Sequence, residues 1–151
     1  MKKLLPLLCI TSLFLSGCFQ EKTTPVREYY ENKNPKLLGS YLEKTGKKHG
    51  EWTHYYENGN LKEIASYKDG ELYGECKTYH NNGKLYSIGS YKDGKEIGEW
   101  KWYHENGELE TIASFKDGKK DGEWKYYHKD GKLYKTEHYK NGELIKTEKP
   151  E

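Results

Sequence analysis

The sequence predicts an all-β fold in which serial β-hairpins form one elongated antiparallel meander sheet. A stretch of about twenty residues recurs four times with a period of 24 residues and no slip. Each copy holds two short segments, and each segment ends at Asn-Gly or Asp-Gly, which are strong signals for a hairpin turn. The segments lack the periodicity of an amphipathic helix.

The first 17 residues are typical of a signal peptide. Lys2 and Lys3 precede an apolar run over residues 4–15, which is shorter than the roughly 20 residues of a membrane-spanning helix. The run ends in Leu-Ser-Gly-Cys, which resembles the lipobox of bacterial lipoproteins. The resemblance implies that Cys18 becomes a lipidated N-terminus in the cell envelope, and the lack of Asp after it favours the outer membrane if the cell is Gram-negative. An ordinary secretory signal that happens to contain a cysteine is the alternative.

Residues 18–38 are expected to form the lipidated N-terminus and a flexible tether. They are polar, contain Pro25 and Pro35 and show no sustained period. Docking of their Tyr and Leu side chains on the following domain is the alternative. Residues 39–49 resemble the end of a repeat with two residues inserted, and predict a capping strand.

Four full repeats follow, over residues 50–73, 74–97, 98–121 and 122–145. Catalytic sites rarely recur four times in one chain, whereas a unit that cannot bury its own apolar face must repeat. The turn glycines are Gly59, Gly83, Gly107, Gly131, Gly70, Gly94, Gly118 and Gly142. The charged tail, residues 146–151, would disfavour pairing of the last edge strand with a strand of another molecule.

A two-residue turn at Asn58-Gly59 would pair Tyr56 with Leu61 and Trp52 with Ala65. This register predicts a structural ladder on one face, made by Trp52, Trp100, Trp124, Leu61, Leu85, Leu109, Leu133, Tyr67, Tyr91, Phe115 and Tyr139. It predicts a partner-binding row on the opposite face, made by Tyr55, Tyr79, Tyr103 and Tyr127. Exposed tyrosines suit protein recognition.

The pattern G-E-W-x-x-Y-x-x-N-G-x-L followed by S-Y-K-D-G resembles the bacterial variant of the MORN repeat, over residues 50–145. The resemblance implies an elongated sheet of serial hairpins. Proteins of this variant are often grouped with antitoxins or immunity partners, and MORN repeats elsewhere act as scaffolds linked to phospholipid contact. Cys76 departs from the pattern by replacing a tryptophan, and Thr136, Glu137 and His138 replace Ile, a small residue and Ser, so that the last repeat reads as a solvent-facing cap.

The charge pattern does not favour nucleic-acid binding. The chain has 26 basic residues, and removal of Lys2 and Lys3 leaves 24 against 24 acidic residues, with no basic block.

The side chains that could act in catalysis or metal binding are better explained by structural roles. His80, His104 and His128 share one repeat position, so they would lie about 10 Å apart and could not converge on a metal ion. Asp69, Asp93 and Asp117 each precede a turn glycine, where Asp is favoured. Cys76 has no general base nearby in sequence, because His80 would lie about 13 Å away. We therefore expect no catalytic residues, no metal and no cofactor.

The sequence predicts a non-enzymatic, lipid-anchored module that binds a protein partner, a toxin being one candidate. The alternative is an envelope scaffold that contacts glycan or phospholipid head groups.

Overall fold

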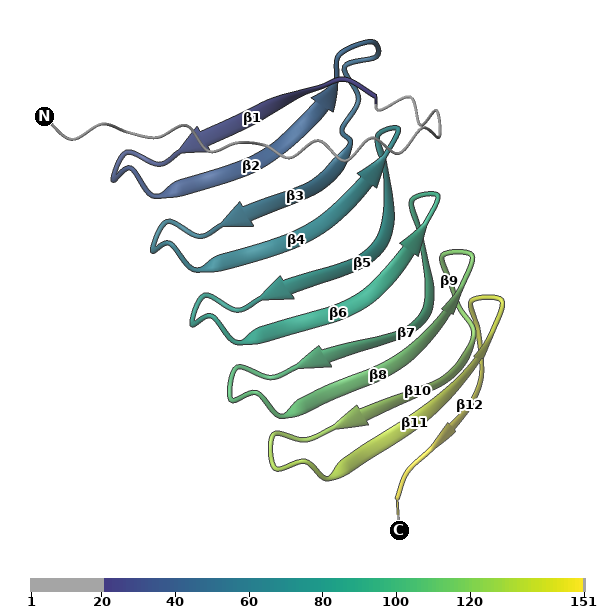
Figure 1. Cartoon of the computed structure of the whole chain (residues 1–151). Helices are drawn as coiled ribbons and strands as arrows, with labels where there is room; N and C mark the ends of the chain where they lie inside the picture. Colours follow the sequence, from purple (N-terminus) through teal and green to yellow (C-terminus); the bar gives the residue numbers. More distant parts are fainter. Residues whose placement is uncertain (1–20, 151) are drawn as a thin grey trace, which may run out of the picture.

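The structure, a computed structural model, describes residues 21–150 and consists there of one open antiparallel sheet without helices (Figure 1). This confirms the predicted fold. Each hairpin lies beside the next, and the chain advances along the sheet without a crossover. The predicted signal peptide and the predicted lipidation site, Cys18, lie outside the described residues.

Twelve strands make up the sheet. They are β1 (Thr23–Tyr29), β2 (Pro35–Leu42), β3 (Gly50–Tyr55), β4 (Leu61–Lys68), β5 (Glu71–Tyr79), β6 (Leu85–Lys92), β7 (Lys95–Tyr103), β8 (Leu109–Lys116), β9 (Lys119–Lys120), β10 (Gly122–Tyr127), β11 (Leu133–Lys140) and β12 (Glu143–Glu148). Strands β9 and β10 both pair with β8, on either side of Asp121.

The prediction of a flexible tether over residues 18–38 is wrong for most of its length. Strands β1 and β2 pair over seven residue pairs and add a fifth hairpin to the sheet. The sequence YENKNPKLLGSY, from Tyr30, matches YENGNLKEIASY, from Tyr56, with a spacing of 26 residues. The extra two residues fall in the connection to β3, and Lys33 takes the place of the turn glycine with φ of 68°. What was expected to be a partial repeat is therefore the end of a complete hairpin.

The Asn-Gly turns differ from the expected two-residue form. The amide of Gly59 donates to Tyr56 O and the amide of Tyr56 donates to Asn60 O, which closes a three-residue loop. Gly59 has φ of 88°, whereas Asn58 is not left-handed. This geometry is a type I turn followed by a left-handed residue. Tyr55, and not Tyr56, consequently pairs with Leu61.

The Asp-Gly turns have the two-residue form. Both Asp69 (φ 52°) and Gly70 (φ 87°) are left-handed, as a type I′ turn requires. The same holds at the equivalent turns that follow β6, β8 and β11. Asp and Asn tolerate this backbone conformation, which accounts for the repeated Asp-Gly and the single Asn-Gly at this position.

A glycine near the middle of β5 and of β7 bends each strand (Figure 1). Ala65 pairs with Cys76, but Tyr67 pairs with Leu72, so the strand that contains Gly74 carries two extra residues there. Gly74 has φ of 77°. In β12 the equivalent residue is Lys146, and the register there shifts by a single residue. The bend folds the ends of the hairpins over one face of the sheet.

That covered face holds the core. Trp52, Trp100 and Trp124 are buried there, and the first two lie directly over glycines of the preceding strand. A Cβ atom on Gly89 would lie 2.0 Å from Cδ2 of Trp100. Because a single-layer sheet has no second layer to pack against, each indole is buried by the neighbouring hairpin.

The two rims of the sheet join successive hairpins. On the rim formed by the turns after β2, β4, β6, β8 and β11, the amides of Gly70, Gly94, Gly118 and Gly142 each donate to a backbone carbonyl that lies just after the preceding turn, at 2.8–3.0 Å. On the opposite rim, the asparagine of each loop spans two hairpins. Asn106 Oδ1 accepts from Glu108 N at 3.0 Å within its own loop, and Asn106 Nδ2 donates to Lys129 O of the next loop at 3.0 Å.

In the last loop of this rim within residues 21–150, between β10 and β11, Asp130 replaces the asparagine. Its carboxylate accepts from Lys132 N at 3.1 Å, so the bond within the loop is kept. An aspartate cannot donate to a further loop. The change from Asn to Asp therefore falls in the one described loop whose asparagine position has no later loop to bind within residues 21–150.

We predict that Asn106→Asp lowers the free energy of unfolding by about 1 kcal/mol, because it removes the donor to Lys129 O and keeps the bond within the loop. Asp130→Asn is the matched control and should change stability by less than about 0.5 kcal/mol. Urea unfolding followed by tryptophan fluorescence measures both. Equal effects of the two substitutions would contradict the assigned role.

Candidate binding face

The four tyrosines of the predicted binding row occupy one position at the ends of β3, β5, β7 and β10. Each pairs directly with a leucine on the following strand. Directly opposed residues in an antiparallel pair present their side chains on the same face. We call the resulting strip the tyrosine face, and it consists of Tyr55, Tyr79, Tyr103 and Tyr127 with Leu61, Leu85, Leu109 and Leu133.

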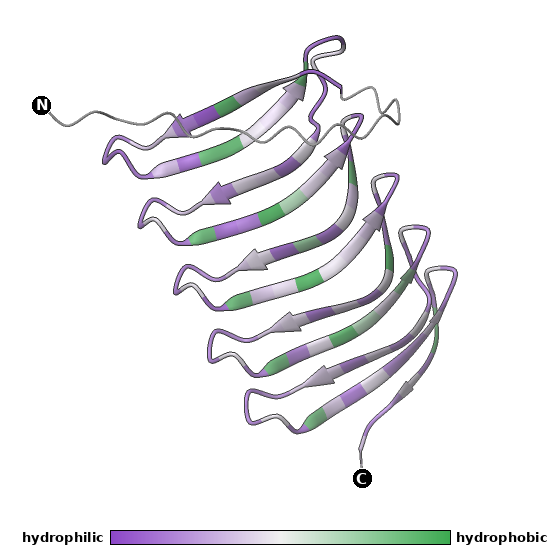
Figure 2. Ribbon diagram, in the orientation of Figure 1, coloured by the Kyte–Doolittle hydropathy of each residue, from purple (hydrophilic) through white to green (hydrophobic). Residues whose placement is uncertain are grey.

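The placement of the leucines corrects the predicted ladder. They were expected beside the tryptophans, but an extra residue, Lys62 in the first repeat, lies between the pairs His54–Glu63 and Tyr55–Leu61. This bulge moves Leu61 to the side of Tyr55. Figure 2 shows the recurrent hydrophobic band at the beginning of β4, β6, β8 and β11. All eight side chains are half-buried, which leaves part of each accessible.

Beyond the tyrosines, the same face carries an isoleucine in each of the first three repeats and a charged pair in each of the last three. Lys77 and Glu75 lie 2.5 Å apart, and the equivalent pairs are Lys101–Glu99 at 2.9 Å and Lys125–Glu123 at 2.7 Å. A shallow hollow here is lined by residues that include Ile64, Lys77 and Tyr79. Because these pairs are exposed, they contribute little to stability. The face is thus an apolar strip bordered by charges, without an enclosed pocket.

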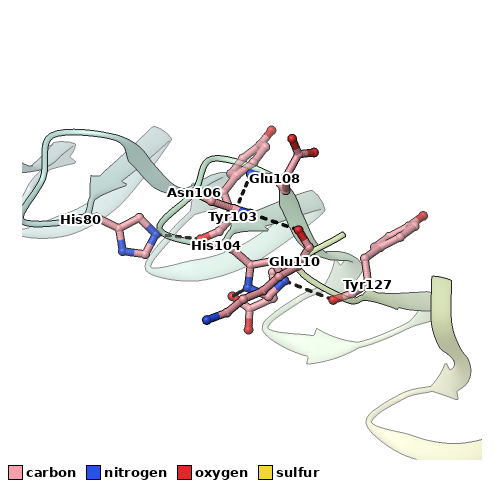
Figure 3. Close-up of polar contacts among 8 residues, drawn as sticks. His80, Tyr103, His104, Asn106, Glu108, Glu110 and Tyr127 are labelled. Atoms are coloured by element: carbon pink, nitrogen blue, oxygen red, sulfur yellow. Dashed lines mark hydrogen bonds and ion pairs between the residues drawn. The ribbon is translucent and has the colours of Figure 1, made fainter. Parts of the chain in front are cut away.

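Histidines from the preceding hairpin hold the backbone of two tyrosines. His80 Nε2 lies 2.8 Å from Tyr103 O, and His104 Nε2 lies 3.2 Å from Tyr127 O (Figure 3). The carbonyl can only accept, so we assign the proton to Nε2 in each histidine. The hydroxyl of Tyr56 makes the equivalent bond to Tyr79 O at 2.7 Å. These residues keep successive tyrosines in register, and the histidines do not converge on one point.

The remaining predicted ladder residues lie on the covered face. Tyr67, Tyr91, Phe115 and Tyr139 contact the tryptophans edge-on, with ring centroids 5.1–6.1 Å apart. Trp102 was missed as a member of this ladder. It stacks between Trp100 and Trp124, with centroids 5.6 and 6.1 Å away. Its position two residues after Trp100 on a strand was the signal that places it on the same face.

Cys76 fills the tryptophan position of its repeat as a small apolar residue. It is buried with Ala65 and Trp100, and Leu72 packs against the same cluster. Burial, and secondarily Glu63, raises the pKa of the Cys76 thiol to about 11. A thiol that stays protonated at neutral pH is a poor nucleophile. This environment agrees with a packing role.

The expectation of a solvent-facing cap in the last repeat is wrong. Thr136 and Glu137 are both buried. Glu137 stands at the position where Gly89 and Ala113 precede the next tryptophan, and within residues 21–150 no tryptophan follows Trp124. Lys135 Nζ donates to Glu137 Oε1 at 2.6 Å. The hydroxyls of Tyr126 and Tyr139 both donate to Glu137 Oε2 at 2.9 Å. The carboxylate therefore occupies the end of the aromatic stack with its oxygens satisfied.

Comparison with protein families decides the identity of the repeat. The protein family described as "MORN repeat variant" matches residues 48–69, 72–93, 96–117 and 120–141. The chain belongs to this family. The matched segments have the 24-residue period read from the sequence and begin two residues before the boundaries chosen there. The MORN repeat variant thus accounts for the four hairpins from β3 to β11, and the hairpin β1–β2 precedes the matched segments.

Other comparisons are distant. A solved structure, the Glycosylation Associate Protein (Gap123) complex from Streptococcus agalactiae, is similar with a TM-score of 0.39 and 16% sequence identity over 76% of this chain. The match spans 20% of the chain in that complex, so the likeness carries no inference about function. No curated protein matches the sequence. Within residues 21–150, no helix is long and apolar enough to span a membrane.

We predict that Glu137→Gln destabilises the protein at pH 7 by about 1–3 kcal/mol, because the charge-assisted bonds from Lys135 and the two tyrosines are lost or weakened. The hydrogen bond from Lys135 holds the pKa of Glu137 below its usual value of 4.5, although burial opposes this.

A lowered pKa in the folded state means that the carboxylate stabilises the fold above its usual pKa and loses this effect as the pH falls below it. The difference between wild type and Glu137→Gln should therefore shrink as the pH decreases below about 4.5. Denaturant unfolding at a series of pH values measures this, and a difference that is constant with pH would contradict the role of the charge.

Proposed function

We propose that this MORN-variant protein is a non-enzymatic binding module, anchored to the cell envelope through a lipid on Cys18, that holds a protein partner on the tyrosine face. The observation that carries the proposal is the strip of four Tyr–Leu pairs, repeated along one uncovered face of the sheet.

The composition of this strip supports protein binding. Tyrosine provides a large contact area with few rotatable bonds, and it is enriched at the energetically dominant positions of interfaces. The lysine–glutamate pairs beside the strip would form a polar rim around an apolar centre, which is the usual anatomy of an interface. Extended repeat surfaces without a pocket favour partner binding over turnover.

The regular spacing further defines what the partner must match. Equivalent tyrosines are separated by two strands, which is about 9.4–9.8 Å at the usual distance between strands. The bonds from Tyr56, His80 and His104 to the backbone of the next tyrosine keep this spacing. A binding surface that is already in place loses less conformational entropy when a complex forms.

The lipid anchor and the antitoxin-like role rest on resemblance. The lipobox-like sequence supports lipidation of Cys18, which would retain the sheet at a membrane surface. The grouping of such repeats with antitoxins makes a toxin one candidate partner. This role would require that the partner inhibit growth when it is produced without the present protein.

We predict that Tyr103→Ser combined with Tyr127→Ser abolishes recovery of a partner after cross-linking in cells, because two neighbouring contacts of the strip are lost. The measurement is affinity capture of the full-length protein followed by quantitative mass spectrometry. The partner should be recovered with the wild type in a near-equal amount.

The matched control is Tyr86→Ser combined with Tyr134→Ser. These tyrosines are 41% and 47% exposed, but they lie against His80 and His128 and outside the tyrosine face. Circular dichroism should show that both double variants keep the sheet. Equal recovery with both variants would overturn the assigned face, and pelleting of the wild type with cell-wall polymer or liposomes, without a protein partner, would favour the glycan or lipid scaffold instead.

A further inference from the structure

Three side chains with metal-binding atoms converge at the turn rim, close to the N-terminal end of the described chain. Glu21 precedes β1, His49 precedes β3, and Asp69 lies in the turn between β4 and β5. One ligand atom from each lies within 4.8 Å of the other two. Residues far apart in the sequence thus form one cluster of an imidazole and two carboxylates.

The imidazole has an unused nitrogen in this cluster. His49 Nδ1 is buried and has no hydrogen-bond partner among the described residues. It lies 3.8 Å from Glu21 Oε2, which is too far for a hydrogen bond. A buried nitrogen without a partner is costly, and a bound cation would satisfy it. Two carboxylates beside that nitrogen would supply the negative charge that such a cation needs.

The repeat pattern does not account for this cluster. The equivalents of His49 in the later connections are Tyr73, Ile97, Asp121 and Ile145. The connection that contains His49 is also the one with the two-residue insertion. Asp69, by contrast, is a regular turn residue with equivalents Asp93 and Asp117, which have no histidine beside them. Substitutions at Asp93 or Asp117 can therefore be compared with the same substitution at Asp69, which separates the role of Asp69 in the turn from its role as a metal ligand.

The donor set indicates the class of metal. An imidazole with two carboxylates suits first-row divalent ions such as Zn²⁺ or Mn²⁺, whereas Ca²⁺ and Mg²⁺ prefer oxygen ligands throughout. Zinc lies about 2.0–2.2 Å from such ligands, so two ligands of one ion are at most about 4.4 Å apart. Small movements of the carboxylate ends would be enough to reach this geometry. Glu21 is 58% exposed and therefore has room to move.

We propose that Glu21, His49 and Asp69 bind one first-row divalent cation, with water completing its coordination. Lys22 and Lys44 line the adjacent hollow together with Glu43, and their positive charges would moderate the affinity. The ion would join the residue that precedes β1 to the turn of the first repeat matched by the family. It would thereby fix the start of the sheet to the first repeat through Glu21, which lies three residues after Cys18. This proposal is independent of the tyrosine face.

Zinc binding to the full chain, measured by isothermal titration calorimetry with ZnCl₂, tests the proposal. We expect one site in the wild type, at least a tenfold loss of affinity in Asp69→Asn and in His49→Gln, and no displacement by Ca²⁺. Asp69→Asn should fold normally, because Asn141 occupies the equivalent turn position with φ of 51°. Asp93→Asn, the matched control at the next turn, should bind zinc like the wild type.

Thermal unfolding gives a second readout. Saturating Zn²⁺ should raise the Tm of the wild type and of Asp93→Asn by about 3–6 °C, and leave the Tm of Asp69→Asn unchanged. No binding by the wild type at about 1 mM Zn²⁺ would overturn the proposal. Equal affinity of the wild type and Asp69→Asn would also overturn it, because the zinc would then bind other histidines.

Discussion

The contact between a tryptophan and the small residue opposite it on the preceding strand is the interaction on which the rest of the structure depends. Trp52 lies over Gly39 and Trp100 lies over Gly89. The sheet has one layer, so this contact between neighbouring hairpins supplies the burial that a second layer would provide elsewhere. A single hairpin of this sequence could not bury its own indole.

The dependence on neighbours explains how the two ends differ from the middle. At the N-terminal end, the hairpin β1–β2 supplies Gly39 as the surface for Trp52. At the C-terminal end, Glu137 occupies the small-residue position and is neutralised by Lys135. A buried carboxylate at this place would be a poor surface for a further indole, because its desolvation would be uncompensated if the local hydrogen bonds were broken. The sequence thus ends its stack with a polar residue.

The same coupling between hairpins shapes the opposite face. Bonds along the loop rim tie the backbone of Tyr103 to His80 and that of Tyr127 to His104. The apolar strip therefore has fixed spacing although it lies at the surface. The repeated contact between hairpins both packs the covered face and orders the uncovered face. A chain with a thin core can therefore present an ordered binding surface.

The period, the hairpin order and the tryptophan ladder could be predicted from the sequence, because each follows from a repeated local signal. The hairpin β1–β2 was missed because Lys33 replaces the turn glycine and two inserted residues change the spacing. The face predicted for the leucines was wrong because an Asn-Gly pair occurs in both two-residue and three-residue turns. A bulge of one residue moves the following side chains to the opposite face of the sheet. The cluster of Glu21, His49 and Asp69 depends on tertiary pairing around the insertion, which local patterns do not reveal.

Amide hydrogen exchange at the turn glycines tests the coupling between hairpins most directly. The amides of Gly70, Gly94, Gly118 and Gly142 donate to carbonyls just after the preceding turn and not within their own turns. Our account predicts that all four exchange as slowly as amides in the centres of their strands, since they are released only when neighbouring hairpins separate. Rapid exchange at these glycines, with protected strands on either side, would show that the hairpins are stable without their neighbours and would contradict the account.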